Sequence, residues 1–185
     1  VCQVARGRIE ECLQMPTSEK SKKIKLDKTV SVKNAVIRDS ENRKVLEIDR
    51  LDIDLSRKNT LWGVNGSGKS TFIKLILKEI ECKEAEVTYG NVNIKKIEDS
   101  CIAGNIFYLP QKDAEIRFTP QELYINICTD NAERALLNAM EFGVKKELLL
   151  SEKIKNLSLG NRRKVFLALA LAQTGKCLIL DEPSN

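Results

Sequence analysis

Residues 63 to 70, with the sequence GVNGSGKS, have the types and spacing of a loop that holds a phosphate chain. Glycines let the backbone N–H groups turn inward around the phosphates, and the ammonium of Lys69 can reach the β- and γ-phosphates. The Ser70 hydroxyl can bind Mg²⁺, and a helix that begins there directs its positive dipole end at the anion. The triphosphate-binding residues that we predict are Gly63, Val64, Asn65, Gly66, Ser67, Gly68, Lys69, Ser70 and Thr71.

The segments on either side of this loop argue against a glycine-rich turn with a chance lysine. Thr60–Trp62 is a short apolar stretch that predicts a strand leading into the loop. Ser70–Glu81 is apolar around most of a helical circumference, with Lys74, Lys78 and Glu81 as one narrow polar stripe. A helix of that kind is buried on several sides, as when it packs on a sheet.

Two adjacent carboxylates follow a second apolar stretch, Cys177–Leu180. We expect a fully buried strand, with Cys177 in the core, that delivers Asp181 and Glu182 beside the phosphates at its carboxyl end. Asp181 would then hold Mg²⁺ through its water shell, and Glu182 would orient and deprotonate an attacking water. A core strand that ends in a solvated turn is the simpler alternative.

Residues 157 to 161, with the sequence LSLGN, lie shortly before these carboxylates. Ser158 can cap a helix whose apolar face would be Val165, Ala168, Leu169 and Ala172. Here the chain resembles the ABC ATPase family, whose signature LSGGQ opens a helix just before the acidic strand. The resemblance implies that Ser158 and Gly160 contact ATP bound to a second nucleotide-binding domain, identical or different, and that the cofactors are ATP and Mg²⁺.

The resemblance extends over about residues 30 to 185, with specific departures. Gln111, after the apolar stretch Phe107–Pro110, resembles the glutamine of the family that contacts Mg²⁺ and the attacking water, so we include it among the catalytic and metal residues. Leu159 and Asn161 replace a glycine and the glutamine of the signature. The aromatic residue that usually stacks on adenine is missing, because no aromatic residue precedes Trp62.

The elements that must position these residues predict an α/β fold. It is a P-loop NTPase core with an N-terminal antiparallel β subdomain, from the β pattern of Thr29–Leu55, and an inserted helical subdomain at about 112–157. Thr119–Glu122 has the pattern of a capping box, Asp130 is expected to cap the start of a second helix, and Gly143 is expected to end a helix. We assign residues 1–28 to a helical segment and linker, as after a transmembrane domain, and residues 29–185 to a nucleotide-binding domain.

The chain also ends before the family's next loop is complete and before its switch histidine, and it contains no histidine. The resemblance therefore implies a C-terminally incomplete domain. The six cysteines form no CxxC pair, which argues against zinc and for reduced thiols. Although the net charge is +5, basic and acidic residues alternate and aromatic residues make up only 5%, so we expect no nucleic-acid partner.

Three features resemble exporters that fuse transmembrane and nucleotide-binding domains: Ala5–Leu13, Ile94–Glu98 and Pro120–Ile127. The implied function is ATP hydrolysis that powers transport, by a dimer on the cytoplasmic side of a membrane and in contact with transmembrane domains. Leu157–Asn161 and Asp181–Asn185 are closer to stand-alone importer subunits. Two other functions stay open: a degenerate ATP-binding half-site, favoured by Leu159 but opposed by Glu182, and a soluble ABC ATPase, which would usually carry long insertions.

Overall fold

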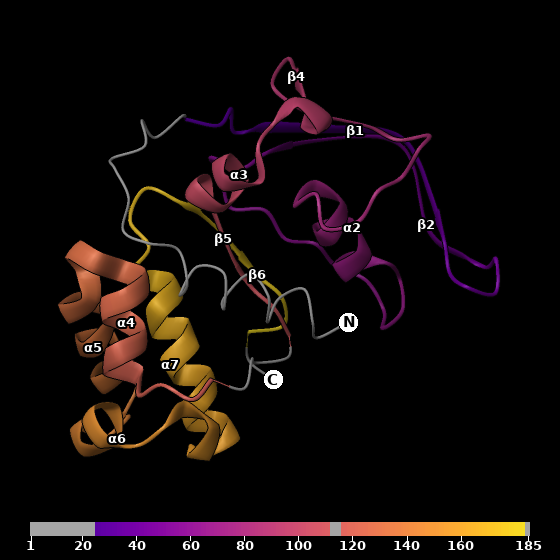
Figure 1. The fold of residues 1–185 in the computed structure, drawn as a ribbon. Helices are drawn as coiled ribbons and strands as arrows, with labels where there is room; N and C mark the ends of the chain where they lie inside the picture. The colour runs from indigo at the N-terminus through magenta and orange to yellow at the C-terminus, as the bar shows by residue number, and fades with distance from the viewer. Residues whose placement is uncertain (1–24, 112–115, 184–185) are drawn as a thin grey trace. The chain divides into compact units, whose positions relative to one another are not determined.

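The computed structural model describes residues 25–111 and 116–183, which fall into two compact units, 25–105 and 106–183. Each unit has its own sheet (Figure 1). The helix expected within Val1–Leu13 lies outside the described residues. Among those described, no helix is long and apolar enough to cross a membrane.

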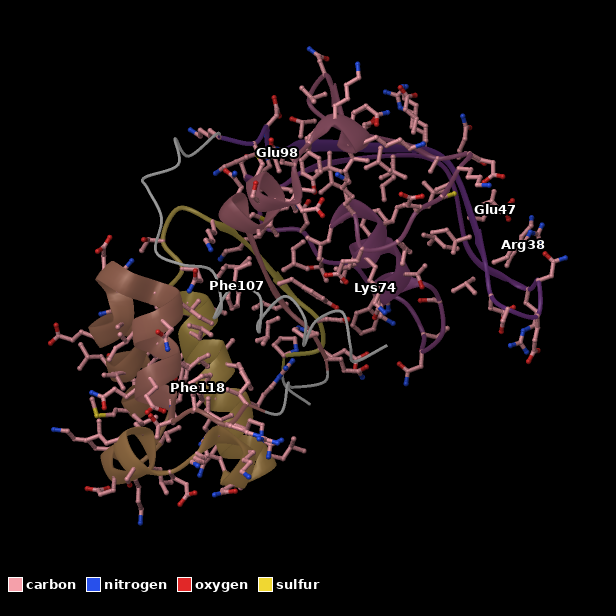
Figure 2. All side chains as sticks on the ribbon, in the orientation of Figure 1. Arg38, Glu47, Lys74, Glu98, Phe107 and Phe118 are labelled. Carbon is pink, nitrogen blue, oxygen red and sulfur yellow. The ribbon has the colours of Figure 1, made fainter. Side chains whose placement is uncertain are left out.

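The first unit is built on an antiparallel sheet with the strand order β2-β1-β3-β4. Its strands are β1 (Thr29–Arg38), β2 (Lys44–Asp54), β3 (Glu86–Tyr89) and β4 (Val92–Asn93). The β1–β2 hairpin is the longest pairing, and Figure 2 shows Arg38 and Glu47 toward its tip. Side chains alternate along β1, with Val30 and Val32 buried. The antiparallel β subdomain predicted from Thr29–Leu55 is confirmed.

One helix, α2 (Lys69–Ile76), packs on this sheet, and the buried hydroxyl of Tyr89 on β3 donates a 2.6 Å hydrogen bond to the carbonyl of Ile76. The helix is shorter than the predicted 70–81 because Lys78 takes a left-handed backbone with φ of 60°. The N–H groups of Lys78 and Glu79 bond back to carbonyls of the last turn, which is a Schellman ending. The unit closes with η1 (Ile94–Lys96) and α3 (Asp99–Asn105).

The strand predicted at Thr60–Trp62 is wrong, because these residues form no ladder with any described strand. Leu61 is exposed and Trp62 is 92% exposed. Asn59, in the turn before them, uses its side-chain amide to donate to the carbonyls of Asp54 and Arg57. An apolar stretch becomes a strand only where a neighbouring backbone satisfies its N–H and C=O groups.

The second unit pairs two parallel strands, β5 (Ile106–Leu109) and β6 (Cys177–Leu180), with a helical bundle (Figure 1). The capping box is confirmed: the Thr119 N–H donates to Glu122, and the Glu122 N–H donates to the Thr119 hydroxyl. Burial of one helix against another is clearest at Tyr124, whose hydroxyl donates to the carbonyl of Val165. The helices are α4 (Pro120–Cys128), η2 (Thr129–Asn131), α5 (Ala132–Glu141), α6 (Lys146–Ser151), η3 (Ile154–Asn156) and α7 (Leu159–Leu171).

Two helix-end predictions in this bundle differ in outcome. Gly143 follows α5 with φ of 82°, so its role in ending the helix is confirmed. The N-cap predicted at Asp130 is wrong, since residues 129–131 form the separate turn η2 and Asn131 precedes α5 without a capping side-chain bond. The side-chain amide of Asn131 donates to the hydroxyl of Thr174, 43 residues further along the chain.

Candidate functional site: a phosphate loop and a carboxylate edge

The loop 63–70 has the backbone geometry that its glycines predict. Gly66 and Gly68 are left-handed, with φ of 81° and 87°. A Cβ on Gly68 would lie 2.5 Å from the carbonyl oxygen of Val45 on β2, so the loop reaches its place against the sheet only with glycine there. Gly68 is also the N-cap of α2, so the loop turns directly into the helix.

The ammonium of Lys69 lies inside the turn of this loop. Its Nζ donates to the carbonyl oxygens of Gly63 at 2.8 Å and Val64 at 3.0 Å. Ser70 and Thr71 stand half-buried in the first turn of α2. The predicted order of a cation, a hydroxyl and a helix N-terminus therefore occurs within one short segment, and that is a combination suited to a polyphosphate.

The two carboxylates stand at the carboxyl end of β6, in the second unit. Asp181 is 6% exposed, and its carboxylate accepts a 3.2 Å hydrogen bond from the Tyr108 hydroxyl on β5. Its backbone N–H donates to the Leu109 carbonyl, which continues the β5–β6 ladder by one residue. Asp181 is thus held by both backbone and side chain.

Glu182 follows in a left-handed conformation, with φ of 47°. Its Oε2 accepts a 2.6 Å hydrogen bond from Nε2 of Gln111. The two predicted catalytic residues therefore meet, at the ends of two paired strands. Gln111 and Glu182 come close together because β5 and β6 pair in parallel, with Leu109 opposite Leu180.

β6 differs from the prediction in one respect. All four of its residues, Cys177 included, are half-buried rather than fully buried. Among the described residues β6 pairs only with β5, so its other edge has no strand against it. A strand is fully buried only when neighbouring elements cover it on both sides.

The signature segment opens α7 as predicted. Ser158 is the N-cap, and its hydroxyl accepts a hydrogen bond from the Asn161 N–H. Gly160 is exposed, and Leu159 is 69% exposed. The first turn of α7 therefore presents an apolar side chain where the signature has a glycine.

We call the residues around Asp181 and Glu182, at the ends of β5 and β6, the carboxylate edge. The sequence analysis missed two of them. Tyr108 contacts Asp181, and Arg163 donates to backbone carbonyls around Glu182. Tyr108 could have been found only by assuming the β5–β6 pairing. Arg163 lies in a run of three basic residues, 162–164, and such a run predicts solvent-exposed side chains.

Similar proteins are known from a family model and from individual relatives. The family model described as ABC transporter matches residues 46–185. The lactococcin transport/processing ATP-binding protein LcnC-like of Lactococcus lactis is 28% identical over 98% of this chain, and the match covers 27% of that protein. The tungstate uptake system ATP-binding protein TupC of Campylobacter jejuni is 34% identical, over 78% of this chain and 44% of its own length.

Among solved structures, a bacterial Atm1-family ABC exporter with ATP bound has the same fold, with a TM-score of 0.70 at 18% identity. The match covers 92% of this chain and 31% of that one. The chain thus spans about a quarter to a third of the length of such relatives. Since the family model matches most of its length, the chain belongs to the ABC transporter family.

Proposed function

We propose that this chain binds MgATP at residues 63–71 and hydrolyses it as one half of an ATPase dimer that powers transport. The observation that supports this most directly is the loop of Gly66, Gly68 and Lys69, in which left-handed glycines bend the backbone around an ammonium. Members of this family are ATPases. Nucleotide and Mg²⁺ use follows from the same membership.

We propose that the chain supplies three ligands for Mg²⁺ by the chemistry of its side chains. Ser70, Asp181 and Gln111 offer a hydroxyl, a carboxylate and an amide, which are the oxygen donors that this hard cation prefers. When bound, Mg²⁺ would neutralise charge that develops on the transferring phosphoryl group. The hydrogen bond from the Tyr108 hydroxyl holds the buried carboxylate of Asp181 in one orientation, which would favour cation binding.

Glu182 is the group that we assign as general base. Gln111 donates to one carboxylate oxygen, which orients the group, and the other oxygen can accept the proton of an attacking water. Ser70 and Lys69 would hold the phosphates on which that water acts. Catalysis then consists of positioning and charge stabilisation, as in other phosphoryl transfers.

The second half of the site would come from another nucleotide-binding domain, identical or different. Ser158 caps α7 and Gly160 lies in its first turn, so the helix dipole and the serine hydroxyl can face an anion bound to the partner. We further propose that residues 29–185 form the nucleotide-binding domain, that residues 1–28 lead to it from a transmembrane domain, and that it acts on the cytoplasmic side of a membrane. We favour an exporter over an importer because the relatives matched over 98% of this chain are named for transport and processing, whereas TupC, named for uptake, matches 78% of it.

The test is nucleotide-dependent dimerisation. This 185-residue chain alone should bind MgATP yet hydrolyse it slowly, because it lacks the hydrogen-bond donors that the signature helix of a second subunit would supply to the γ-phosphate. Each such donor that is lost from around a transferring phosphate costs about 10²–10³ in rate. In the full-length protein, Glu182→Gln should accumulate a stable ATP-bound dimer, seen by size-exclusion chromatography with MgATP. Brisk turnover by a monomer would refute the two-domain mechanism.

A degenerate half-site is the second candidate, and the exposed Leu159 supports it. A bulky side chain on the first turn of α7 hinders the close backbone approach that a glycine permits. This function predicts that Leu159→Gly raises ATP turnover in the full-length dimer. Unchanged turnover in that variant would argue for an already competent site.

A further inference from the structure

Arg163 is a buried cation whose hydrogen bonds converge on the carboxylate edge. It lies on α7 and is 6% exposed. Its Nη2 donates to the carbonyl oxygens of Asp181 and Glu182, both at 3.0 Å. Its Nη1 donates to the Pro110 carbonyl at 2.8 Å, and its Nε to the Pro183 carbonyl at 3.3 Å.

These four acceptors belong to two separate chain segments. One is the end of β5, where Pro110 immediately precedes Gln111, and the other is the turn after β6 that contains Glu182. One planar guanidinium therefore holds the backbone on both sides of the Gln111–Glu182 hydrogen bond. Its rigid fork of five N–H donors can reach several carbonyls at once, whereas a lysine ammonium is a point charge on a flexible stem.

The backbone that Arg163 holds is strained. Glu182 has a φ of 47°, a conformation that L-residues other than asparagine and aspartate rarely adopt. Such a conformation persists only where the surroundings impose it. The bonds to the carbonyls of Asp181 and Glu182 flank the strained residue, so they oppose its relaxation.

We propose that Arg163 is a positioning residue for ATP hydrolysis, which aligns Glu182 and Gln111 by clamping the backbone next to each. The inference rests on the proposed function, in which Glu182 is the general base. Arg163 acts through the carbonyls of other residues, so it should affect the rate of hydrolysis more than the binding of ATP.

The test compares Arg163→Lys with wild type in the full-length protein. We expect kcat to fall by at least about tenfold, while KM and the Kd for MgATP change by less than about threefold. Arg134→Lys is the matched control: it makes the same exchange at an exposed position of α5, and its kcat should equal that of wild type. Equal kcat in wild type and Arg163→Lys would overturn the proposal.

A double-variant cycle separates positioning from general loss of structure. If Arg163 works through Glu182, Arg163→Lys should cost little further rate in a Glu182→Gln background, measured in single turnover. Losses that multiply in the double variant, or a fall in ATP affinity that parallels a fall in Tm, would show a merely structural role. If Arg163→Lys does not fold, Arg163→Gln, which retains two amide donors, replaces it, and if neither folds the proposal is overturned.

The two proposals fail in different ways. A wild-type protein that binds MgATP and hydrolyses it, with an Arg163 variant of equal rate, would remove only the role of Arg163. A wild-type protein that neither binds nor hydrolyses ATP would remove the proposed function, and the role of Arg163 with it. The wild-type measurement therefore comes first.

Discussion

Nε2 of Gln111 donates a 2.6 Å hydrogen bond to Oε2 of Glu182, across 71 residues of sequence. The bond joins the residues that follow β5 and β6, two strands paired in parallel. An amide that donates to a carboxylate fixes the plane and direction of that carboxylate. The amide oxygen of the same side chain is then the atom suited to accept from water or to bind a cation.

The first prediction concerns this bond. Gln111→Glu replaces the donor with a second negative charge, so the two carboxylates should repel and Glu182 should lose its orientation. We expect ATP hydrolysis to fall by about 10²-fold, within the range attributed to a positioned general base. Gln111→Ala removes the donor without adding charge and should lose less. Phosphate release by the full-length protein measures both, and equal losses would contradict the repulsion argument.

The second prediction concerns Lys69. In Lys69→Ala the loop loses the ammonium that bonds to the Gly63 and Val64 carbonyls and that we expect on the β- and γ-phosphates. Affinity for MgATP should fall by at least about tenfold, because a charge-assisted contact is lost and nothing in the motif replaces it. Calorimetry or a fluorescent ATP analogue measures this. Lys74→Ala, on the same helix (Figure 2), is the matched control and should bind normally, whereas unchanged affinity in folded Lys69→Ala would refute the assignment.

The third prediction concerns the base of the nucleotide. Stacking on an aromatic ring contributes about 1–3 kcal/mol, and no aromatic residue precedes Trp62 in this chain. Discrimination between ATP and GTP should therefore be weak in a competition experiment. A preference for ATP above about a hundredfold would mean that another residue reads the base. Trp62→Leu would then show whether the exposed Trp62 does so.

The fourth prediction concerns alkaline pH. Burial raises the pKa of Tyr124 far above its ordinary value of 10.0, and Cys128 nearby adds to the rise. Below pH 10 the phenol is protonated in both the folded and the unfolded chain, so its full contribution to the free energy of unfolding is present. Above pH 10 that contribution is lost progressively, because the phenol ionises in the unfolded chain while it stays protonated in the folded one. Above pH 10 the free energy of unfolding should fall by up to about 1.4 kcal/mol per pH unit from this group.

Tyr124→Phe tests that sign. The variant lacks the bond to the Val165 carbonyl and should be about 1 kcal/mol less stable at neutral pH. The difference from wild type should shrink above pH 10, because phenylalanine has no proton to release. Urea unfolding at several pH values measures it. A constant difference up to pH 11 would contradict the assignment to Tyr124.

Local sequence determined the features that depend on neighbouring residues. The capping box of Thr119 and Glu122 and the cap by Ser158 appear as predicted, because their partners lie three residues away. The antiparallel β pattern and the family are likewise confirmed. The roles assigned to Glu182, Gln111 and the other site residues stay predictions.

Tertiary structure decided what depends on distant partners. Thr60–Trp62 has the composition of a strand but no described neighbour to complete its hydrogen bonds. α2 ends at Ile76 because Lys78 turns left-handed, with its ammonium 2.7 Å from the Ile97 carbonyl and 3.1 Å from Asp99. Arg163 could be seen as a clamp only once α7 lay against the turn at Glu182. Apolar periodicity and caps encode contacts within a few residues, whereas these contacts exist only after the chain has folded.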